Sequence, residues 1–495
     1  MSDRMCGVQM GAWLKEMWLR VILGVVIAAT APAVSSAWTF TQSGAGKEGH
    51  QAVLARHGGV YNDPDLADYL TALGQRLAAE TDEPPEEWEF TLLDSSDIAA
   101  FARPGGYIYV TRGLMAFASS EAGLATVLAH QMAHALKDHF DDNTRPSNVP
   151  DRGLAPGALL DGLIGGTNEV SSPPPTDRVT GERPVFTREM EVAAAAEGVR
   201  ILADAGYPAH LAVSFANRLL DFDELSRKLN GRSEVDLFGR TSADKIATVQ
   251  EIGKVAEAFP RPIIDVDYSG PYLSVIEGLT YGESPTQGFL RDQSFIHPDL
   301  RFTFELPEGF SAEISAAEVA ARGPNGALMV LDTTNEAGDR LESYIRDKWA
   351  PSLTRSVNAG YLFDLTSRTI GGFEAASAFQ PYDDAEGAKV AQLVVIRTDR
   401  RVYRFRAIAS AEAFDVSLLM EEAIDSFQEI PVAVAARYKP YWIQIHEVRQ
   451  GDSLNILTAA MPFREGAEEF FRALNNYPDR AVPMVGDRIK IVMEE

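Results

Sequence analysis

Two histidines four residues apart are the side chains of this sequence best placed for chemistry. His130 and His134 lie in the stretch VLAHQMAHALKDH, whose apolar spacing predicts a helix. On a helix, side chains at i and i+4 project from one face, so both imidazoles can bind one cation. This is the spacing of the zinc-binding HExxH helix, in which the intervening glutamate deprotonates the attacking water. Here that residue is Gln131, an amide that cannot take up a proton.

The elements that must position these histidines follow from periodicity and turn residues. The histidines lie on a predicted helix from Ser120 to His139, and Pro104-Gly105-Gly106 introduces a predicted strand before it. Further predicted elements are helical spacing over Gln51–Ala79, strands Trp88–Leu93 and Tyr107–Thr111, and a long helix Thr187–Ala205. The segment from Asp141 to Pro184 is rich in Pro, Gly and Asp, which is typical of a flap over a site or of a disordered stretch.

Composition limits the class of protein. The chain has 495 residues, of which 45% are hydrophobic and 23% are charged, so two to four globular domains are expected. Asp and Glu outnumber Lys and Arg by 71 to 45, which gives a formal net charge of −26. A nucleic-acid partner is therefore not expected, because binding to phosphates requires clustered basic residues.

The N-terminus has the pattern of an export signal. Lys15 and Arg20 precede an apolar run from Val21 to Val34, and Ser35-Ser36-Ala37 offers small residues before a cleavage point. Cleavage would place the mature chain in a periplasmic compartment and remove the single cysteine, Cys6, excluding disulfides and thiol catalysis. The run is shorter than the roughly 20 residues of a membrane span, and an uncleaved anchor is the alternative.

The second half of the chain is richer in strand-like runs than the first half. The sequence as a whole predicts an α+β multidomain protein. After a first domain at 38–262 and a linker at 263–287, residues 288–430 contain β-like runs with two helical stretches, which predict an α/β sandwich domain. Residues 436–495 show a strand, helix, helix, strand pattern, typical of a small βααβ module.

The stretch FARPGGYIYVTRGLMAFASSEAGLATVLAHQMAHALKDH, residues 101–139, resembles the BepA-type periplasmic zinc metallopeptidases. These are gluzincins related to the HtpX heat-shock protease and the CAAX prenyl protease. The resemblance implies that residues 38–262 form a metallopeptidase-like domain, which is mainly helical and of the zincin type with a small β-sheet. It also implies a Zn²⁺ ion, and unfolded or envelope polypeptides as partners. It also implies that His139 is structural or supports the ligands from behind.

The resemblance places the third zinc ligand on a later helix. Aligning Arg188 and Gly198 of TREMEVAAAAEG with the family pattern assigns the ligand to Glu191 and the family's aspartate to Ala195. Glu189 is the rival ligand. Positions two apart on a helix face nearly opposite ways, so only one of the two glutamates can reach the metal.

Four departures from the family pattern weaken the expectation of hydrolysis. Gln131 replaces the general base, Ala195 replaces a bracing aspartate, Ala99 stands where the family usually has Asn, and residues 237–245 lack a frequent His-Pro. Loss of a general base typically costs about 10² to 10⁴ in rate. The expected protein is a zinc metalloendopeptidase whose hydrolysis is weak or lost through natural change; an engineered Glu-to-Gln substitution is the alternative.

A strand beside the histidines is the expected substrate site. Gly105 and Gly106 precede Tyr107 and Tyr109 on an alternating strand, and a peptide could add to its edge through backbone hydrogen bonds. Packing of the two tyrosines in the core is the alternative.

The two C-terminal regions resemble known modules. Residues 288–430, with FIHPDLRFTFELPEGF near their start, are similar to a PsbP-like domain, and residues 436–495 resemble a LysM module. The latter implies contact with peptidoglycan, and a docking domain without a sugar site is the alternative. Three hypotheses follow: an active zinc endopeptidase, a zinc-containing non-catalytic chaperone or scaffold for envelope polypeptides, and a cell-wall-binding protein.

Overall fold

The structure is a computed structural model that describes residues 44–137, 139–140, 186–230, 235–238, 241–261, 268–291, 293–315, 317–353, 361–384, 387–463, 466–477 and 481–494. The predicted export signal and most of the predicted flap lie outside these residues. No helix within these ranges is both long enough and apolar enough to span a membrane.

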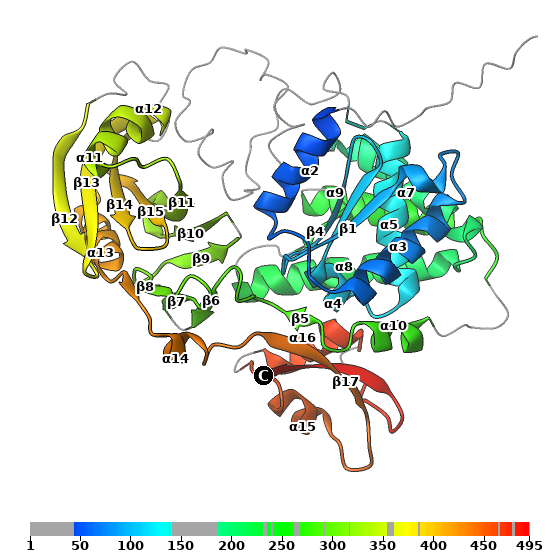
Figure 1. The fold of residues 1–495 in the computed structure, drawn as a ribbon. Coiled ribbons are helices and arrows are strands. Elements are labelled where there is room, and N and C mark those ends of the chain that lie inside the picture. Colours follow the sequence, from blue (N-terminus) through cyan, green and yellow to red (C-terminus); the bar gives the residue numbers. More distant parts are fainter. Residues whose placement is uncertain are drawn as a thin grey trace, which may run out of the picture. The chain divides into compact units, whose positions relative to one another are not determined.

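The first region (residues 44–281) surrounds a small sheet with helices (Figure 1). Its helices are α2 (Gly44–Arg56), α3 (Pro64–Ala78), α4 (Arg112–Phe117), α5 (Glu121–Leu136), α7 (Arg188–Asp204), α8 (Ala209–Asn230), α9 (Ser242–Ala256) and α10 (Ser269–Val275), with a 3₁₀ turn at Pro85–Glu87. Its strands are β1 (Glu89–Leu93), β2 (Ile98–Arg103), β3 (Tyr107–Thr111), β4 (Val235–Asp236) and β5 (Thr280–Tyr281).

The order of strands in the first sheet is β1-β3-β2-β4. β3 pairs with β1 in parallel and with β2 antiparallel, and β4 pairs in parallel with only the first two residues of β2. The turn from β2 to β3 passes through Gly105 and Gly106, whose positive φ angles of 91° and 79° favour glycine.

Helix α5 is the buried centre of this region. The Ser120 hydroxyl caps its N-terminus by accepting a hydrogen bond from the backbone N–H of Gly123 at 3.2 Å, and Glu121 adds a negative charge to the first turn. Its side chains are buried nearly all round, as expected for a helix that is apolar on every face. The histidines therefore lie in the interior of the domain and not on a solvated helix face.

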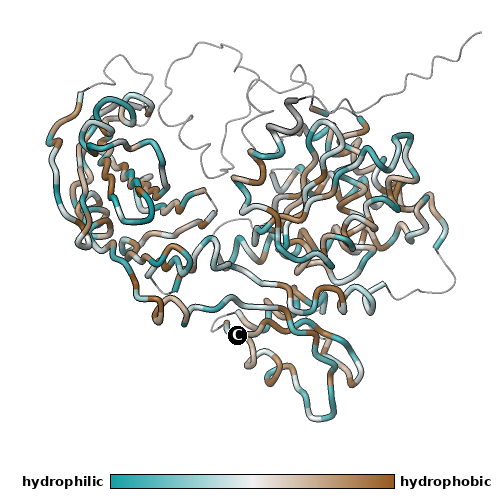
Figure 2. The backbone as a smooth tube through the Cα atoms, viewed as in Figure 1, coloured by the Kyte–Doolittle hydropathy of each residue, from teal (hydrophilic) through white to brown (hydrophobic). Residues whose placement is uncertain are grey.

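The middle region (residues 289–435) packs two sheets with helices. A seven-stranded sheet has the order β12-β13-β14-β15-β11-β10-β9 and a four-stranded sheet has the order β16-β8-β7-β6. Figure 2 shows hydrophobic residues along β14 and β15, which supply buried side chains to both faces of the larger sheet. Helix α13 contributes to the core on one face, and the helical segment 341–353 covers the other.

The elements of the middle region have these bounds. The strands are β6 (Phe289–Arg291), β7 (Ser294–His297), β8 (Phe302–Glu305), β9 (Ser311–Ile314), β10 (Glu318–Arg322), β11 (Leu328–Thr334), β12 (Phe363–Ile370), β13 (Phe373–Asp384), β14 (Gly387–Arg397), β15 (Val402–Ser410) and β16 (Gln428–Glu429). The helices are α11 (Leu341–Tyr344), a π-helical turn (Ile345–Trp349), α12 (Ala350–Leu353), α13 (Phe414–Asp425) and α14 (Val432–Ala435), with a 3₁₀ turn at Pro324–Gly326.

The C-terminal module (residues 441–494) has the predicted strand, helix, helix, strand order. It consists of β17 (Tyr441–Glu447), α15 (Leu454–Ala459), α16 (Ala467–Asn475) and β18 (Arg488–Glu494). Its sheet has the order β18-β17-β5, so β5 of the first region completes it. Buried residues such as Ile443, Phe471 and Ile491 belong to the same hydrophobic core as α5. The C-terminal module is therefore continuous with the first region.

The structure confirms the mixed α+β architecture with several regions and most of the predicted elements. Residues 263–287 were expected to be a linker. Their described part instead contains α10 and β5, because Tyr272 and Ile276 are fully buried and Thr280 and Tyr281 pair with β17. Strand β2 was not foreseen, since its first five residues, IAAFA, are all apolar and lack the alternation of a half-buried strand.

Candidate metal centre

Two helices bring three potential ligands together. His130 and His134 lie one turn apart on α5, and Glu191 lies in the first turn of α7. The Nε2 atoms of the two histidines are 3.2 Å apart. Glu191 Oε2 lies 3.1 Å from Nε2 of His130 and 3.5 Å from Nε2 of His134. All three residues are buried.

The spacing of these donor atoms fits one divalent cation. Zinc–ligand distances of about 2.0–2.2 Å at tetrahedral angles require donor atoms about 3.3–3.5 Å apart, and the three observed separations of 3.1, 3.2 and 3.5 Å are close to this. Two imidazoles and one carboxylate are also a ligand set used by catalytic zinc sites. The residues therefore fit zinc, with His130, His134 and Glu191 as its holders.

The protonation states that burial imposes suit metal binding. Burial lowers the pKa of His134 to about 4, although the Glu191 carboxylate acts in the opposite direction. Burial acts to raise the pKa of Glu191, but the two imidazoles outweigh it and hold this pKa below its ordinary value. At neutral pH, His134 therefore offers a lone pair and Glu191 a negative charge, as metal ligands must.

Hydrogen bonding to His139 can fix the tautomer of His134. Nδ1 of His139 lies 2.9 Å from Nδ1 of His134. When Nε2 of His134 uses its lone pair on a cation, its Nδ1–H can donate to Nδ1 of a neutral His139. Burial and the nearby Lys137 lower the pKa of His139 to about 4, so His139 is neutral at neutral pH and can accept. This arrangement suits the supporting role that the sequence suggested.

The residue between the histidines leaves a buried acceptor. Gln131 is 5% exposed, and its Oε1 atom is buried without a hydrogen-bond partner among the described residues. Nδ1 of His130 is buried and likewise has no such partner. A buried polar atom without a partner costs free energy, so each atom can take a hydrogen-bonding group that reaches it. Gln131 can accept a hydrogen bond from such a group but cannot remove its proton.

Two aromatic rings contact the imidazoles and were not foreseen. Phe186 stacks on His134 with ring centroids 3.8 Å apart, and Phe238 meets His130 edge-on at 4.9 Å. Phe238 is 2% exposed and has a φ of 63°, an unfavourable backbone conformation for a bulky residue. It lies in the segment noted for lacking His-Pro, which was the one sequence signal that could have pointed to it.

The structure also places the rival ligand and the two altered positions that the sequence singled out. Glu189 is exposed, so the structure brings Glu191 and not its rival to the histidines. Ala195 is 1% exposed, lies in the core one turn after Glu191, and has no side-chain polar atom with which to brace a ligand. Ala99 is fully buried on β2, opposite Asp236 of β4.

The expectation that the strand at 105–111 has a free edge is wrong. β3 is hydrogen-bonded to β1 on one side and to β2 on the other, so no backbone edge is available for a peptide. Tyr107 and Tyr109 are 3% and 0% exposed and pack with Phe101 and His50. Core packing thus accounts for both tyrosines, and Gly105 and Gly106 form the turn before the strand.

Comparison with known proteins agrees with this geometry. Residues 64–147 match the model of peptidase family M48. A putative beta-barrel assembly-enhancing protease of Vibrio cholerae serotype O1 is 31% identical over 179 residues, which cover 35% of this chain and 37% of that protein. The beta-barrel assembly-enhancing protease of Escherichia coli K12 is 28% identical over 169 residues, or 33% of this chain and 34% of its own length.

A more distant relative shares a shorter stretch. The mitochondrial metalloendopeptidase OMA1 of Schizosaccharomyces pombe is 32% identical over 71 residues, covering 14% of this chain and 21% of that protein. The chain spans only about a third of the length of the first two relatives. Within that span the chain is similar to the beta-barrel assembly-enhancing proteases, and residues 64–147 match the model of peptidase family M48.

Proposed function

We propose that this chain is a zinc-binding M48-type protein that binds polypeptides and hydrolyses them slowly or not at all. The observation that carries the proposal is Gln131: a buried amide directly follows the first of two histidines whose imidazoles converge, at the position where hydrolysis needs a carboxylate. A bound zinc ion would polarise a peptide carbonyl and acidify a water molecule. His130, His134 and Glu191 would hold it, and Gln131 would orient an incoming group without accepting its proton.

Envelope or unfolded polypeptides are the proposed partners, supported by the names of the two assembly-enhancing relatives.

The proposed compartment is the periplasm, reached through a cleaved signal at residues 1–37. For the middle region and the C-terminal module we keep the PsbP-like and LysM-like assignments as part of the proposal. The proposal includes contact of the C-terminal module with peptidoglycan. Cosedimentation of the full chain with purified peptidoglycan tests this contact.

A second candidate is a fully non-catalytic zinc-containing chaperone or scaffold, or a cell-wall-binding protein. It is favoured by the joint change of two positions, because Gln131 lacks the general base and Ala195 lacks any group that could brace Glu191. The two candidates differ in whether the native chain retains slow cleavage that depends on zinc.

The test combines zinc stoichiometry with cleavage of an unfolded polypeptide such as β-casein. We expect about one zinc per native chain and little cleavage, with cleavage rising about 10²-fold or more in Gln131→Glu. Ala195→Asp is added in a second variant to restore the brace. Glu191→Gln should lose zinc, whereas Glu189→Gln, a change on the exposed side of the same helix turn, should retain it.

Two results would overturn the proposal. A native chain that refuses zinc while folded would remove the metal centre. Native cleavage as fast as that of Gln131→Glu would show that the amide does not limit hydrolysis. Persistent inactivity of both restored variants, with zinc bound, would favour the second candidate.

A further inference from the structure

A cavity in the middle region lies outside the metal centre and has its own set of side chains. Its volume is about 170 Å³. Four structural segments meet around it: the turn between β7 and β8, the start of β13, the turn between β14 and β15, and the end of α13 with β16. The side chains that line it are Leu300, Arg301, Phe302, Phe373, Thr398, Asp399, Arg400, Tyr403, Phe427 and Glu429.

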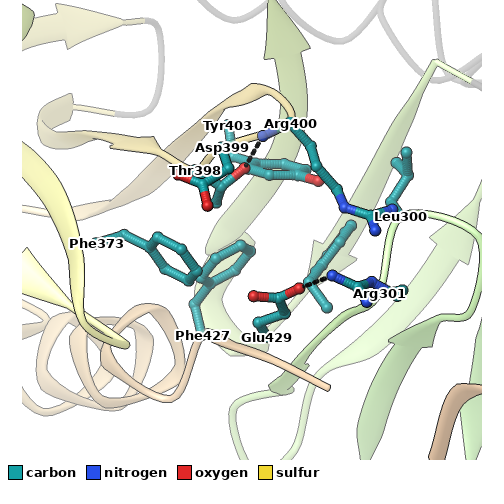
Figure 3. A pocket seen from close by; sticks show the side chains of 10 residues that line it. Leu300, Arg301, Phe373, Thr398, Asp399, Arg400, Tyr403, Phe427 and Glu429 are labelled. Atoms are coloured by element: carbon teal, nitrogen blue, oxygen red, sulfur yellow. Dashed lines mark hydrogen bonds and ion pairs between the residues drawn. The ribbon is translucent and has the colours of Figure 1, made fainter. Parts of the chain in front are cut away.

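One side of the cavity is aromatic. Figure 3 shows Phe373 and Phe427 on one side, facing Arg301 and Arg400 on the other. Phe427 packs edge-on against Phe373 with their ring centroids 6.4 Å apart, and the ring centroids of Tyr403 and Phe427 are 5.2 Å apart. An engineered apolar cavity of about 150 Å³ holds one benzene molecule. The space is therefore right for a single aromatic ring.

The opposite side of the cavity carries the guanidinium groups of Arg301 and Arg400, which differ in their interaction partners. Arg301 forms an ion pair with Glu429, so its charge is balanced within the cavity wall. The described hydrogen bond of the Arg400 guanidinium is a long one of 3.4 Å to the carbonyl oxygen of Asp299. Arg400 thus keeps donors and charge for a ligand. Asp399 also lines the cavity, whereas Arg401, which follows Arg400 on the same turn, does not.

A hydroxyl group adds a neutral donor beside this charge. Tyr403 is 1% exposed, and its side chain lines the cavity. Burial raises the pKa of Tyr403 to about 12, although Arg401 and Arg400 act to lower it. The phenol therefore stays protonated at neutral pH, close to two positive charges. A guanidinium and a neutral O–H donor together match the two oxygens of a carboxylate.

The backbone at the cavity is also unusual. Arg301 has a φ of 58°, a conformation that costs free energy for a residue with a side chain. Its N–H donates to the carbonyl of His297 at 2.7 Å, and its carbonyl accepts from Ile430 at 2.9 Å. These two bonds hold the strained residue at the cavity rim, and strain of this kind clusters at binding sites.

We propose that this cavity is a binding site for a single aromatic ring carrying a carboxylate, with the ring against Phe373 and Phe427 and the carboxylate on Arg400 and Tyr403. Two sources share this chemistry: a free aromatic monocarboxylic acid, and the C-terminal residue of a polypeptide that ends in phenylalanine or tyrosine. The site is independent of the metal centre, since none of its lining residues belongs to that centre.

Calorimetric titration of the full chain tests the proposal with three probes. They are benzoate, the tripeptide Ala-Ala-Phe with a free carboxylate, and benzylamine as a cation of matched size. We expect saturable binding of at least one carboxylate probe and none of benzylamine. Tighter binding of the tripeptide would identify a polypeptide end as the source, and tighter binding of benzoate a free acid.

Variants separate the site from general attraction to basic residues. Arg400→Gln should weaken carboxylate binding about tenfold or more, and Tyr403→Phe should weaken it several-fold. Arg401→Gln is the matched control, because Arg401 carries the same charge on the same turn without lining the cavity; it should change affinity less than about twofold. Phe373→Leu should weaken binding while Arg400 is intact.

The outcomes that overturn the proposal are specific. One is the absence of saturable binding of either carboxylate probe to the native chain at about 10 mM, the weak end expected for so small a ligand. Others are equal affinity for benzylamine, or an equal loss in Arg401→Gln and Arg400→Gln. Thermal unfolding of each variant shows that the chain remains folded when binding is lost.

Discussion

The ammonium group of Lys490 on β18 donates a 2.8 Å hydrogen bond to the backbone carbonyl of Phe117, the last residue of α4. It also donates to the carbonyls of Ala116 and Ala118, at 2.8 and 2.9 Å. Lys490 is fully buried, and burial lowers its pKa well below the ordinary value. A cation from the end of the chain thus caps the helix that leads into α5.

Replacing Lys490 by methionine should therefore destabilise the whole chain. Three carbonyl groups would lose this donor inside the core, and among the described residues only that of Phe117 would keep another, Nη2 of Arg218 at 2.6 Å. The expected cost is about 2–4 kcal/mol in the free energy of unfolding. Lys254→Met is the control, because Lys254 is 75% exposed and pairs with Glu251 at the surface; its loss should cost less than about 1 kcal/mol. Urea denaturation measures both, and equal effects would contradict the capping role.

Gly198 should be required for zinc affinity. A Cβ atom at this position would lie 2.9 Å from the Cα and backbone N of His130, so any side chain must push α7 away from α5. Glu191 lies on α7, and metal–ligand distances tolerate only about 0.2 Å of change. Gly198→Ala should lower zinc affinity about tenfold or more in a competition assay with a chelating dye.

The control for that change is Gly253→Ala on α9. A Cβ atom there meets nothing within 4 Å. This variant should keep full zinc affinity and gain up to about 1 kcal/mol of stability, because alanine favours a helix over glycine. Unchanged zinc binding in Gly198→Ala would show that the two helices can separate without moving the ligands.

His139 should support zinc binding through His134. Its removal takes away the acceptor for the Nδ1–H of His134, and loss of such an outer partner typically costs about 10- to 100-fold in metal affinity. We expect this loss in His139→Ala, measured by chelator competition at neutral pH. His210→Ala, on α8 outside the metal centre, is the reference variant. Equal affinities in the two variants would exclude the supporting role.

His297 should make stability depend on pH in mildly acidic solution. It is 8% exposed, its Nδ1 accepts a hydrogen bond from the N–H of Leu300, and burial, together with Arg401, lowers its pKa to about 4. Between about pH 6.5 and pH 4 the unfolded chain binds a proton that the folded chain does not. Stability from the neutral ring is therefore complete above about pH 6.5 and decreases as the pH falls.

The measurement compares native chain with His297→Gln by urea denaturation at about pH 7 and pH 4.5. The native chain should lose up to about 3 kcal/mol more than the variant over this interval, since one pKa unit corresponds to about 1.4 kcal/mol. Contributions from other titrating groups are common to both proteins and cancel in the difference. Parallel pH profiles would show that His297 is not kept neutral by the fold.

The sequence predicted the metal centre where local spacing was sufficient. His130 and His134 lie one helical turn apart, so their convergence follows from helix geometry, and the helix predicted at 120–139 is observed as Glu121–Leu136. Glu191 is separated from His130 by 61 positions, and its approach depends on how α7 packs against α5. No local period encodes that packing, so the assignment needed the family resemblance.

Local sequence patterns could not predict the strand order or the aromatic packing. The alternation of residues 107–111 predicted β3 correctly, but the position of β3 between β1 and β2 arises from pairing with distant strands. Phe186 and Phe238 contact the imidazoles from segments with no periodic pattern. The buried role of Lys490 was hidden for the same reason, since its sequence context is that of an ordinary edge of a small sheet.

The pairing of β5 with β17 has a consequence for biogenesis. Thr280 and Tyr281 form a sheet with Trp442 and Tyr441, so β5 gains these strand neighbours only after residue 442 of 495 has been synthesised. Closing so long a loop costs chain entropy before the contact between the strands contributes any stabilising free energy. The first region, which holds the metal centre, should therefore complete its fold only after β17 has been synthesised. A chain truncated before Tyr441 should be a substrate for quality-control proteases.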